Sequence, residues 1–144
     1  MAEFYVPITN EFFASQVAEL LNKHNKLTVV HNVHSILQDN TQYFVEVVSA
    51  PAIEKRVVGC VGLRYEEPTL SKIKHVCVDP VYRRFGVARR LIETAISNCD
   101  TEYVYMTIRE DNIPSLKLAK SLGFVFVNKI WKQDHFVLTV GRRK

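Results

Sequence analysis

Four arginines surround one glycine in the segment VYRRFGVARRL, residues 81–91. The pattern becomes helical at Gly86, so the arginines stand at or beside a helix N-terminus; they are Arg83, Arg84, Arg89 and Arg90. That end of a helix already carries partial positive charge and unpaired N–H groups, and an exposed arginine there costs up to about 1 kcal/mol. A bound anion would remove this conflict, and glycine lets the backbone approach it closely. The segment predicts an anion site, with a solvated basic helix face as the alternative.

Size and composition limit what the anion can be. The 144 residues suit one domain, and 47% hydrophobic with 24% charged residues is a globular balance. No apolar run approaches the roughly 20 residues that a membrane-spanning helix needs, and the N-terminus lacks the pattern of a secretory signal. The net charge of +4 does not by itself indicate nucleic acid. We therefore expect a cytoplasmic protein with no membrane or nucleic-acid partner.

Cysteine, histidine and glycine spacings exclude several other site types. Three cysteines, an odd number without CxxC spacing, favour a reduced cytosol over a disulfide framework or a zinc site. His31 and His34 are spaced HxxH, but no further ligands accompany them, so we expect no metal. Neither GxxxxGK[ST] nor GxGxxG occurs, which excludes the Walker and dinucleotide-binding loops.

Strand and helix patterns alternate along the chain and must position these residues. Strands are predicted at 4–8, 42–50, 55–65, 70–78, 102–108, 124–132 and 135–141. Helices are predicted at 9–25, 32–40, from Gly86 onward and at 111–123. The strand–helix–strand unit over 70–108 makes its two strands parallel, whereas the hairpins are antiparallel. We expect an α/β (α+β) fold, residues 1–144, with one mixed, mostly antiparallel sheet of about seven strands, a parallel fourth–fifth pair and about four helices on both faces.

Two segments carry a resemblance to a known family. VCVDPVYRRFGVARRLIETAI (76–96) resembles the acetyl-CoA-binding segment of the GNAT family of N-acetyltransferases. That signature is Arg or Gln, two residues, Gly, one residue, then Gly or Ala, after a strand ending in Val-x-Pro. Here it reads Arg83 to Ala88 after Val78-Asp79-Pro80, and REDNIPSLKLAKSLGF (109–124) resembles a second family element. The order of elements also matches, so the resemblance covers nearly the whole chain and implies the GNAT fold.

The resemblance implies where acetyl-CoA, the acetyl donor, would bind. The pyrophosphate would lie on the signature loop, whose residues are Arg83, Arg84, Phe85, Gly86, Val87, Ala88 and Arg89. The pantetheine arm would pair with the fourth strand at Val76, Cys77 and Val78, where an N–H near Val76 would polarise the acetyl carbonyl. Asn112 matches the family asparagine that contacts the pantetheine region, and it is equally placed to cap a helix. Ser115 would face the same cleft, with an ordinary first-turn position as the alternative.

The implied reaction is direct attack of a primary amine on the thioester, and the usual acid and base are both missing. The family tyrosine that protonates the thiolate corresponds to Ala119, so the acid would be Ser115 or a water. The family glutamate base corresponds to about Lys72, which is protonated near neutral pH. His75 is the base candidate on that strand, because its ordinary pKa near 6.5 suits the role. It alternates with Ile73 and Cys77, so a place among core residues is the alternative.

Other polar residues are weaker candidates. Glu66 and Glu67, expected in a turn, could bind a cationic acceptor or act through water, or be solvated. Asp134 and His135 lie near the last hairpin, a region that often borders the acceptor in the family, with ordinary loop residues as the alternative. Cys77, between two valines, fits core filling better than a nucleophile.

The acceptor is open at this stage, and so is the oligomeric state. Residues 22–40 and 131–135 are the expected acceptor loops, and the acceptor would be a small molecule or a protein. The missing tyrosine and glutamate leave a catalytically silent acyl-CoA-binding module as the alternative function. A small basic nucleic-acid binder is a third possibility, without a zinc-finger, RRM or KH signature. We expect a monomer or a homodimer, the latter through a C-terminal edge strand such as HFVLTV (135–140).

Overall fold

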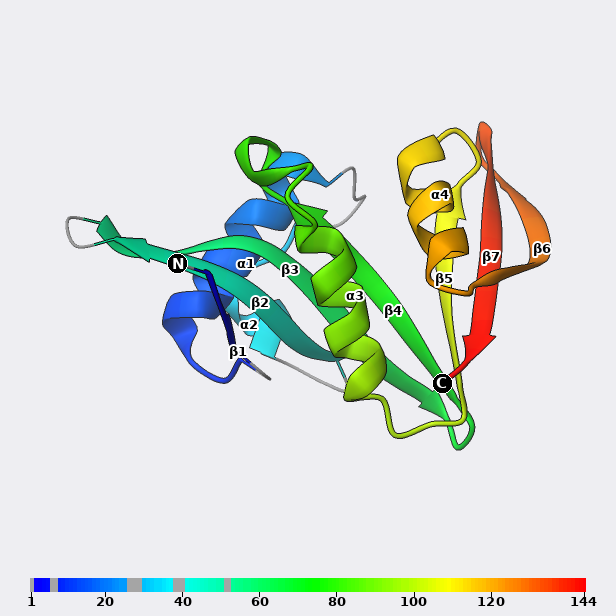
Figure 1. The fold of residues 1–144 in the computed structure, drawn as a ribbon, viewed down its shortest axis with the longest axis horizontal. Helices are drawn as coiled ribbons and strands as arrows, with labels where there is room; N and C mark the ends of the chain where they lie inside the picture. The colour runs from blue at the N-terminus through cyan, green and yellow to red at the C-terminus, as the bar shows by residue number, and fades with distance from the viewer. Residues whose placement is uncertain (1, 6–7, 26–29, 38–40, 51–52) are drawn as a thin grey trace.

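A computed structural model of the chain describes residues 2–5, 8–25, 30–37, 41–50 and 53–144. Seven strands form one mixed sheet in the order β1-β2-β3-β4-β5-β7-β6 (Figure 1). They are β1 Ala2–Tyr5, β2 Thr41–Ala50, β3 Ile53–Glu67, β4 Leu70–Val78, β5 Tyr103–Arg109, β6 Val125–Lys132 and β7 His135–Arg143. The helices are α1 Glu11–His24, α2 Val33–Leu37, α3 Val87–Ser97 and α4 Ile113–Ser121, with a single 3-10 turn, η1, at Pro80–Tyr82.

The fold prediction is confirmed, including the parallel β4–β5 pair among otherwise antiparallel neighbours. Most boundaries fall within two residues of the predicted ones, but the second helix ends at Leu37 and the first strand ends at Tyr5. The predicted positions 6–7 and 38–40 lie outside the described residues. The turn η1, which the sequence analysis did not separate from the following helix, brings the chain from β4 to α3.

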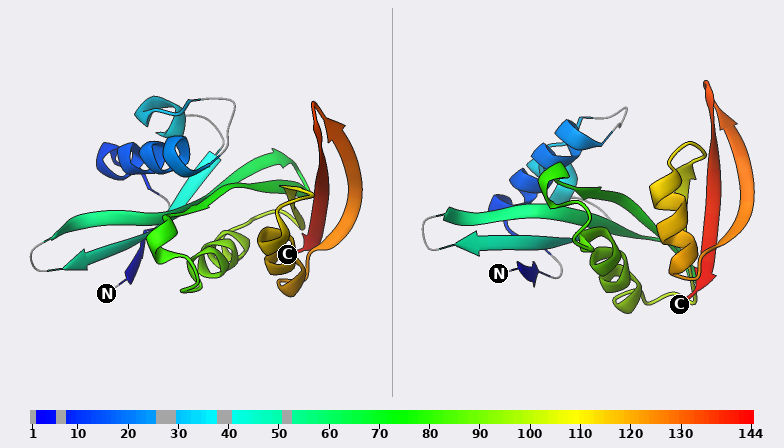
Figure 2. Two further views of the ribbon diagram at one scale, coloured as in Figure 1. Left: turned by 90° about the horizontal axis from the view of Figure 1, so that it is seen from above. Right: turned by 45° about the horizontal axis from the view of Figure 1, so that its top comes forward.

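Helices cover both faces of the sheet (Figure 2). On one face α1 and α2 pack over β2, β3 and the end of β4, with buried side chains that include Val17, Leu21, Ile36 and Val45. On the other face α3 and α4 enclose the second cluster, including Leu91, Val104, Met106 and Ala119. No α-helix described here is long and apolar enough to cross a membrane, and α1, the longest, has 14 residues.

Local signals in the sequence explain how α1 and α3 sit on the sheet. Asn10 caps α1 by accepting a hydrogen bond from the Phe13 N–H at 2.9 Å. The close packing of α3 on β3 depends on Gly59, because a Cβ there would lie 2.8 Å from Val87 Cγ1 and 2.9 Å from Leu91 Cδ1. A side chain at Gly59 would push α3, and the loop before it, away from the sheet.

The feature that positions the site is the short contact between β4 and β5. These strands pair only where Leu70–Lys72 meets Tyr103–Tyr105. Beyond Lys72 they diverge, as Figure 1 shows, while β4 stays paired with β3 and β5 with β7. The backbone groups of residues 73–78 that point toward β5 therefore have no strand partner there. An extended ligand could pair with this side of β4.

The structure corrects three local predictions. Strand β7, which contains HFVLTV, lies between β5 and β6, so it is an interior strand and not the edge expected for dimer pairing. Glu66 and Glu67 end β3 instead of lying in the following turn. The strand predicted to begin at residue 55 already begins at Ile53. Strand order and strand ends depend on which neighbouring strand supplies hydrogen-bond partners, as Leu70 does for Glu67, and the residue pattern alone does not reveal this.

Candidate functional site

The loop between β4 and α3 has a conformation that few residues adopt. Arg84 and Gly86 both have positive φ angles, 71° and 77°. Before them, the Asp79 carboxylate accepts a hydrogen bond from the Val81 N–H at 3.0 Å, and it forms an ion pair with Arg56 at 2.7 Å. Burial opposes ionisation of Asp79, but the Val81 N–H and the Arg56 guanidinium together hold the pKa of Asp79 below its ordinary value. The turn is thus fixed by a charged side chain on its inner side.

The N-terminus of α3 is available to a ligand. Gly86 occupies the N-cap position and provides no side-chain cap for the helix. The first N–H groups of the helix have no carbonyl partner within it, and they carry the positive end of the helix dipole. This arrangement fits a phosphate, the group for which an uncapped helix N-terminus after a glycine turn is best suited.

The four arginines near Gly86 have separate structural environments. Arg83 Nε donates to the Val78 carbonyl at 3.1 Å, which ties the loop back to β4. Arg89 reaches α4, where it donates to Ser121 Oγ at 2.7 Å. Arg90 holds the loop itself, because its Nη1 donates to the Phe85 carbonyl at 2.8 Å. Arg84 and Phe85 are exposed, whereas the Val87 side chain is buried in the core and Ala88 is half-buried, so these two could offer a ligand only backbone groups.

A buried carboxylate behind the loop was missed by the sequence analysis. Glu46 of β2 is 2% exposed and accepts hydrogen bonds from Arg90 Nε and Nη2, both at 2.9 Å. The signal was present in the sequence: Glu46 is a lone charge in the apolar strand QYFVEVVSA. A charge in such a strand is retained when a buried partner compensates it, but the sequence does not indicate which of many cations that is.

A bulge interrupts β4 at His75 and Val76. Cys60 lies opposite Cys77 and Gly62 opposite Lys74, so a single β3 residue between them faces two residues of β4. His75 has a positive φ of 56°, and its carbonyl accepts a hydrogen bond from the Cys60 thiol at 3.4 Å. The bulge changes the direction of the backbone groups next to Val76, in the part of β4 that faces away from β3 and lacks a strand partner.

The His75 side chain is held by neighbours on the α1 face of the sheet. Its Nδ1 lies 2.7 Å from the Tyr43 hydroxyl, and its ring meets the His31 ring edge-on with 4.9 Å between centroids. Burial first, then the positive charges of Lys74, His31 and Lys72, lower the pKa of His75 to about 4. His75 is therefore neutral at pH 7 and a weak base.

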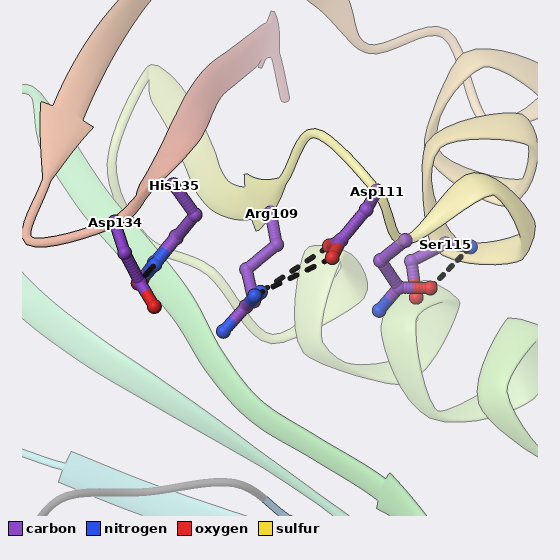
Figure 3. A network of polar contacts seen from close by, with 6 residues as sticks. Arg109, Asp111, Ser115, Asp134 and His135 are labelled. Atoms are coloured by element: carbon purple, nitrogen blue, oxygen red, sulfur yellow. Dashed lines mark hydrogen bonds and ion pairs between the residues drawn. The ribbon is translucent and has the colours of Figure 1, made fainter.

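Asn112 is the N-cap residue of α4, the helix that follows β5, and Ser115 lies in the first turn of that helix (Figure 3). The Asn112 side chain accepts a hydrogen bond from the Ser115 N–H at 3.3 Å, which makes it the helix cap. Ser115 is half-buried, and its hydroxyl is engaged by no other described residue. Ala119, where the family tyrosine would stand, is buried in the core.

Two more pairs lie near the open end of the sheet. Arg109 contacts Asp111 at 3.2 Å, and His135 Nδ1 lies 2.9 Å from the carboxylate of its chain neighbour Asp134, where β7 begins (Figure 3). At the other end of β5, the Tyr105 hydroxyl donates to Glu66, and the Lys72 ammonium lies 5.7 Å from the Tyr105 ring centroid. Glu66 was a candidate from the sequence, whereas Tyr105 was not.

Cys77 does not have the environment of a nucleophile. It is 5% exposed, and its thiol is directed at the Leu20 carbonyl at 3.7 Å. Burial raises the pKa of Cys77 to about 11 despite the nearby Arg83 charge. A thiol with this pKa is protonated at neutral pH and unreactive.

Comparisons with known proteins identify the family. The model of the acetyltransferase (GNAT) family matches residues 9–124, which is most of the chain. The chain therefore belongs to the GNAT family of acetyltransferases. A curated relative, an uncharacterised protein of Mycobacterium leprae, is 32% identical over 66 residues, or 46% of this chain. That match spans only 18% of the relative's length.

Solved structures share the fold over nearly the whole chain. Arabidopsis thaliana NAA60, in complex with a bisubstrate analogue, has a TM-score of 0.81 at 18% identity, covering 99% of this chain and 98% of that one. The NatC complex bound to Gag peptide and CoA gives 0.81 at 16% identity, with 99% and 98% covered. Salmonella typhimurium yncA with its cofactor acetyl-CoA gives 0.75 at 14% identity, with 97% and 93% covered. At these identities the likeness shows the fold alone.

Proposed function

We propose that this protein is an acetyl-CoA-dependent N-acetyltransferase that acetylates a primary amine of a small molecule or a protein. The observation that carries the proposal is the divergence of β4 and β5 beyond Lys72, next to an uncapped helix N-terminus. An extended thioester ligand with phosphates at one end could pair with the free side of β4 and place its phosphates at this helix N-terminus. The NatC and yncA structures support it, since these relatives by fold bind CoA and acetyl-CoA.

The residues of the chain would divide the work of binding. Backbone N–H groups of residues 84–89 would hold the phosphates, and the exposed Arg84 would add a charge-assisted bond. Backbone groups of Val76, Cys77 and Val78 on the side of β4 that faces away from β3 would pair with the pantetheine arm. Val78 would offer its N–H, because its carbonyl already accepts the hydrogen bond from Arg83 Nε. Asn112 would contact the same arm with the part of its amide that the cap does not use.

The chemical step would depend mainly on positioning. Bringing amine and thioester together supplies much of the acceleration. The N–H next to the bulge at Val76 would stabilise the oxyanion, and Ser115 or a water would protonate the departing thiolate. His75 would take a proton from the amine as a neutral imidazole, with its low pKa limiting its strength as a base.

The cellular location and the domain boundaries of the protein are also part of this proposal. We propose a single domain over 1–144 in the cytoplasm. The three cysteines support this location, since all are buried and free.

Two measurements test this function against a silent acyl-CoA-binding module. Acetyl-CoA should raise the Tm, because a ligand that binds only the folded state stabilises it, by about 2.7 kcal/mol at 100 times Kd. Absence of a shift at millimolar acetyl-CoA would refute donor binding. Thiol release with a panel of amines then separates the two functions: turnover supports the transferase, and binding without turnover on any amine supports the silent module.

A further inference from the structure

Strand β6 forms one edge of the sheet and is exposed along its whole length. Among the described strands it pairs with β7 alone, and Figures 1 and 2 show it at the outer side of the sheet. All eight of its residues are exposed. Every second residue of such a strand points its N–H and C=O away from the neighbouring strand. The edge therefore offers a row of backbone groups to which another strand could bind.

Most of the exposed side chains of β6 are large and apolar. They are between 49% and 64% exposed, and they are Val125, Phe126, Val127, Ile130 and Trp131. An aromatic side chain buries about 150–250 Å² when it is fully covered, so the phenylalanine and the tryptophan alone leave roughly 200–300 Å² of surface open. With the three aliphatic residues, the patch reaches the roughly 300–600 Å² that often marks an interaction site on a monomer.

A bulge at Val127 divides β6 into two parts. Phe126 and Asn128 stand opposite consecutive residues of β7, so Val127 is the extra residue between them. From Asn128 to Lys132 the register with β7 is regular, and successive side chains point to alternate faces of the sheet. This regular segment, 128–132, is the part of the edge that a further strand could follow residue by residue.

The two lysines of β6 do not protect this edge in the way that charges on edge strands commonly do. The Lys129 ammonium forms an ion pair with Glu110 at 3.1 Å and lies 4.4 Å from the Phe136 ring centroid, so it is directed over β7. Lys132 is the last residue of the strand, and its charge acts on Lys72 of β4, three strands away. Both side chains are thus directed over the sheet and leave the free edge open.

The regular segment is complementary to itself. In an antiparallel pair of identical strands related by a twofold axis, directly opposite residues share a face, so the axis passes through a residue. With the axis at Ile130, this side chain meets its own copy. Lys129 then meets Trp131 of the second copy, which is a favourable cation–π pair. Asn128 meets Lys132, so every residue of the segment is paired and no lysine stands opposite a lysine.

The neighbouring registers fit less well. An axis at Lys129 places two lysines directly opposite each other, which is destabilising. An axis at Trp131 pairs only three residues, because Gln133 has a positive φ of 55° and belongs to the turn before β7. An axis at Asn128 pairs residues across the bulge at Val127, where the alternation of faces is interrupted. The register at Ile130 is therefore the longest regular one without opposed charges.

We propose that the protein is a homodimer in which the β6 strands of two copies pair antiparallel about an axis at Ile130. The two seven-stranded sheets then form one continuous sheet. The opposite edge strand, β1, has four residues against the eight of β6, and a short edge strand is a common protection against association. A twofold β6–β6 contact uses both long edges and closes at two copies. The apolar side chains of β6 supply a large part of the roughly 800 Å² per subunit that a stable interface buries.

The first test is the mass of the protein in solution, which does not depend on acetyl-CoA or on turnover. Sedimentation velocity covers protein concentrations of about 1–100 µM, since interfaces of this size reach from micromolar to tighter Kd values. The wild type should sediment with twice the mass of one chain and dissociate only on dilution. A monomer at every concentration would overturn the proposal. Assemblies that grow beyond two copies would also overturn it, because they would mean open-ended pairing of edges.

Charged residues at the axis test the interface and its register. Ile130→Glu places two carboxylates opposite each other, and Ile130→Lys places two ammonium groups there, so each variant should raise the dimer Kd at least about 100-fold. An equimolar mixture of the two variants should form dimers again, because glutamate then faces lysine. Phe12→Glu on α1 replaces a similarly exposed apolar residue away from β6 and is the matched control that should stay dimeric. A wild-type Kd in either Ile130 variant would reject β6 as the interface, and a mixture that stays monomeric would reject this register.

A thiol at the axis gives a second readout if the charged variants do not fold. The three natural cysteines are all buried, so oxidation of Ile130→Cys should join two copies through residue 130 alone. Phe12→Cys is the control, which should stay a single chain on a non-reducing gel under the same conditions. Absence of the cross-link in Ile130→Cys, or equal cross-linking in both variants, would overturn the proposed pairing.

Discussion

Arg90 of α3 and Glu46 of β2, 44 positions apart, form a two-bonded ion pair with both N···O distances at 2.9 Å. The Glu46 side chain is 2% exposed and the Arg90 side chain 43% exposed. The third hydrogen bond of Arg90 goes to the Phe85 carbonyl at 2.8 Å, next to Gly86. A buried charge in the sheet thereby fixes the position of the candidate phosphate loop.

Arg90→Ala should destabilise the protein and weaken donor binding together. Removing the cation leaves the Glu46 carboxylate buried without its partner, and breaking a fully buried pair costs about 3–5 kcal/mol. Because Arg90 is partly exposed, we expect about 2–3 kcal/mol by urea unfolding and a raised KM for acetyl-CoA. The Glu46→Leu and Arg90→Met pair should recover most stability but keep the raised KM, since Phe85 stays unanchored. A wild-type KM in the double variant would contradict the role of Arg90 in holding the loop.

Substitutions at Gly86 should separate backbone strain from steric blocking. A φ of 77° costs an ordinary L-residue about 1–2 kcal/mol, and asparagine less. A Cβ at this position would also lie 3.1 Å from Arg90 Nη1. Gly86→Asn should be the mildest change, Gly86→Ala should lose about 1 kcal/mol, and Gly86→Glu should abolish the Tm shift by acetyl-CoA. A folded Gly86→Glu protein that binds normally would show that the phosphates lie elsewhere.

Two substitutions at Asn112 should distinguish the helix cap from a ligand contact. Asn112→Ala removes the acceptor for the Ser115 N–H and should cost about 1 kcal/mol. Asn112→Asp keeps that acceptor, so unfolding in urea should be close to wild type, but the amide donor is lost. A raised KM for acetyl-CoA in both variants would support contact with the donor. A wild-type KM for Asn112→Asp would restrict the residue to capping.

Ser115→Ala should lower kcat without lowering stability. The hydrogen bond to Asn112 uses the backbone N–H of Ser115, which alanine retains. If the hydroxyl protonates the leaving thiolate, kcat should fall by about 10²-fold or more, with KM little changed. Ser97→Ala, at the far end of α3, is the matched control. A kcat within about twofold of wild type would assign the proton to water.

His75→Phe should make the protein less sensitive to acid between pH 6.5 and about 4. The folded-state pKa of about 4 lies below the ordinary value of 6.5, so the unfolded chain takes up this proton first as the pH falls. As the pH falls through that window, the wild type therefore loses the free energy of unfolding that depends on a neutral His75. The phenylalanine variant has no such group and shows no such loss. The urea midpoints of unfolding at pH 7, 6, 5 and 4 give the pH dependence of stability for both proteins. The same pH dependence in the variant and the wild type would contradict the prediction.

The same variant tests His75 as the base. A drop in kcat/KM of about 10²-fold or more would support proton transfer by the imidazole. Tyr43→Phe removes only the hydroxyl that holds Nδ1, so it separates positioning from chemistry. If kcat/KM changes less than tenfold in both variants, His75 is not the base and contributes only to the β4 bulge.

Local patterns in the sequence predicted the order of the elements and the loop at Gly86. These features depend on short-range rules: the 3.6-residue or 2-residue period, a cap such as Asn10, and a glycine where φ must be positive. The bulge at His75 could not be predicted in the same way, because the strand LSKIKHVCV contains no glycine or other local signal at the register shift.

The sequence alone determined the family signature, the helix that begins at Val87 and the place of Asn112 at the start of α4. Only the tertiary structure decided that β4 leaves β5 after Lys72, that Glu46 anchors Arg90, and that Arg64 stands opposite Lys72. The physical reason is that a turn or a helix is specified by neighbouring residues, whereas strand register and buried pairs depend on the packing of segments far apart in the chain. The donor loop belongs to the first kind of feature, and the ion pair of Glu46 with Arg90 to the second.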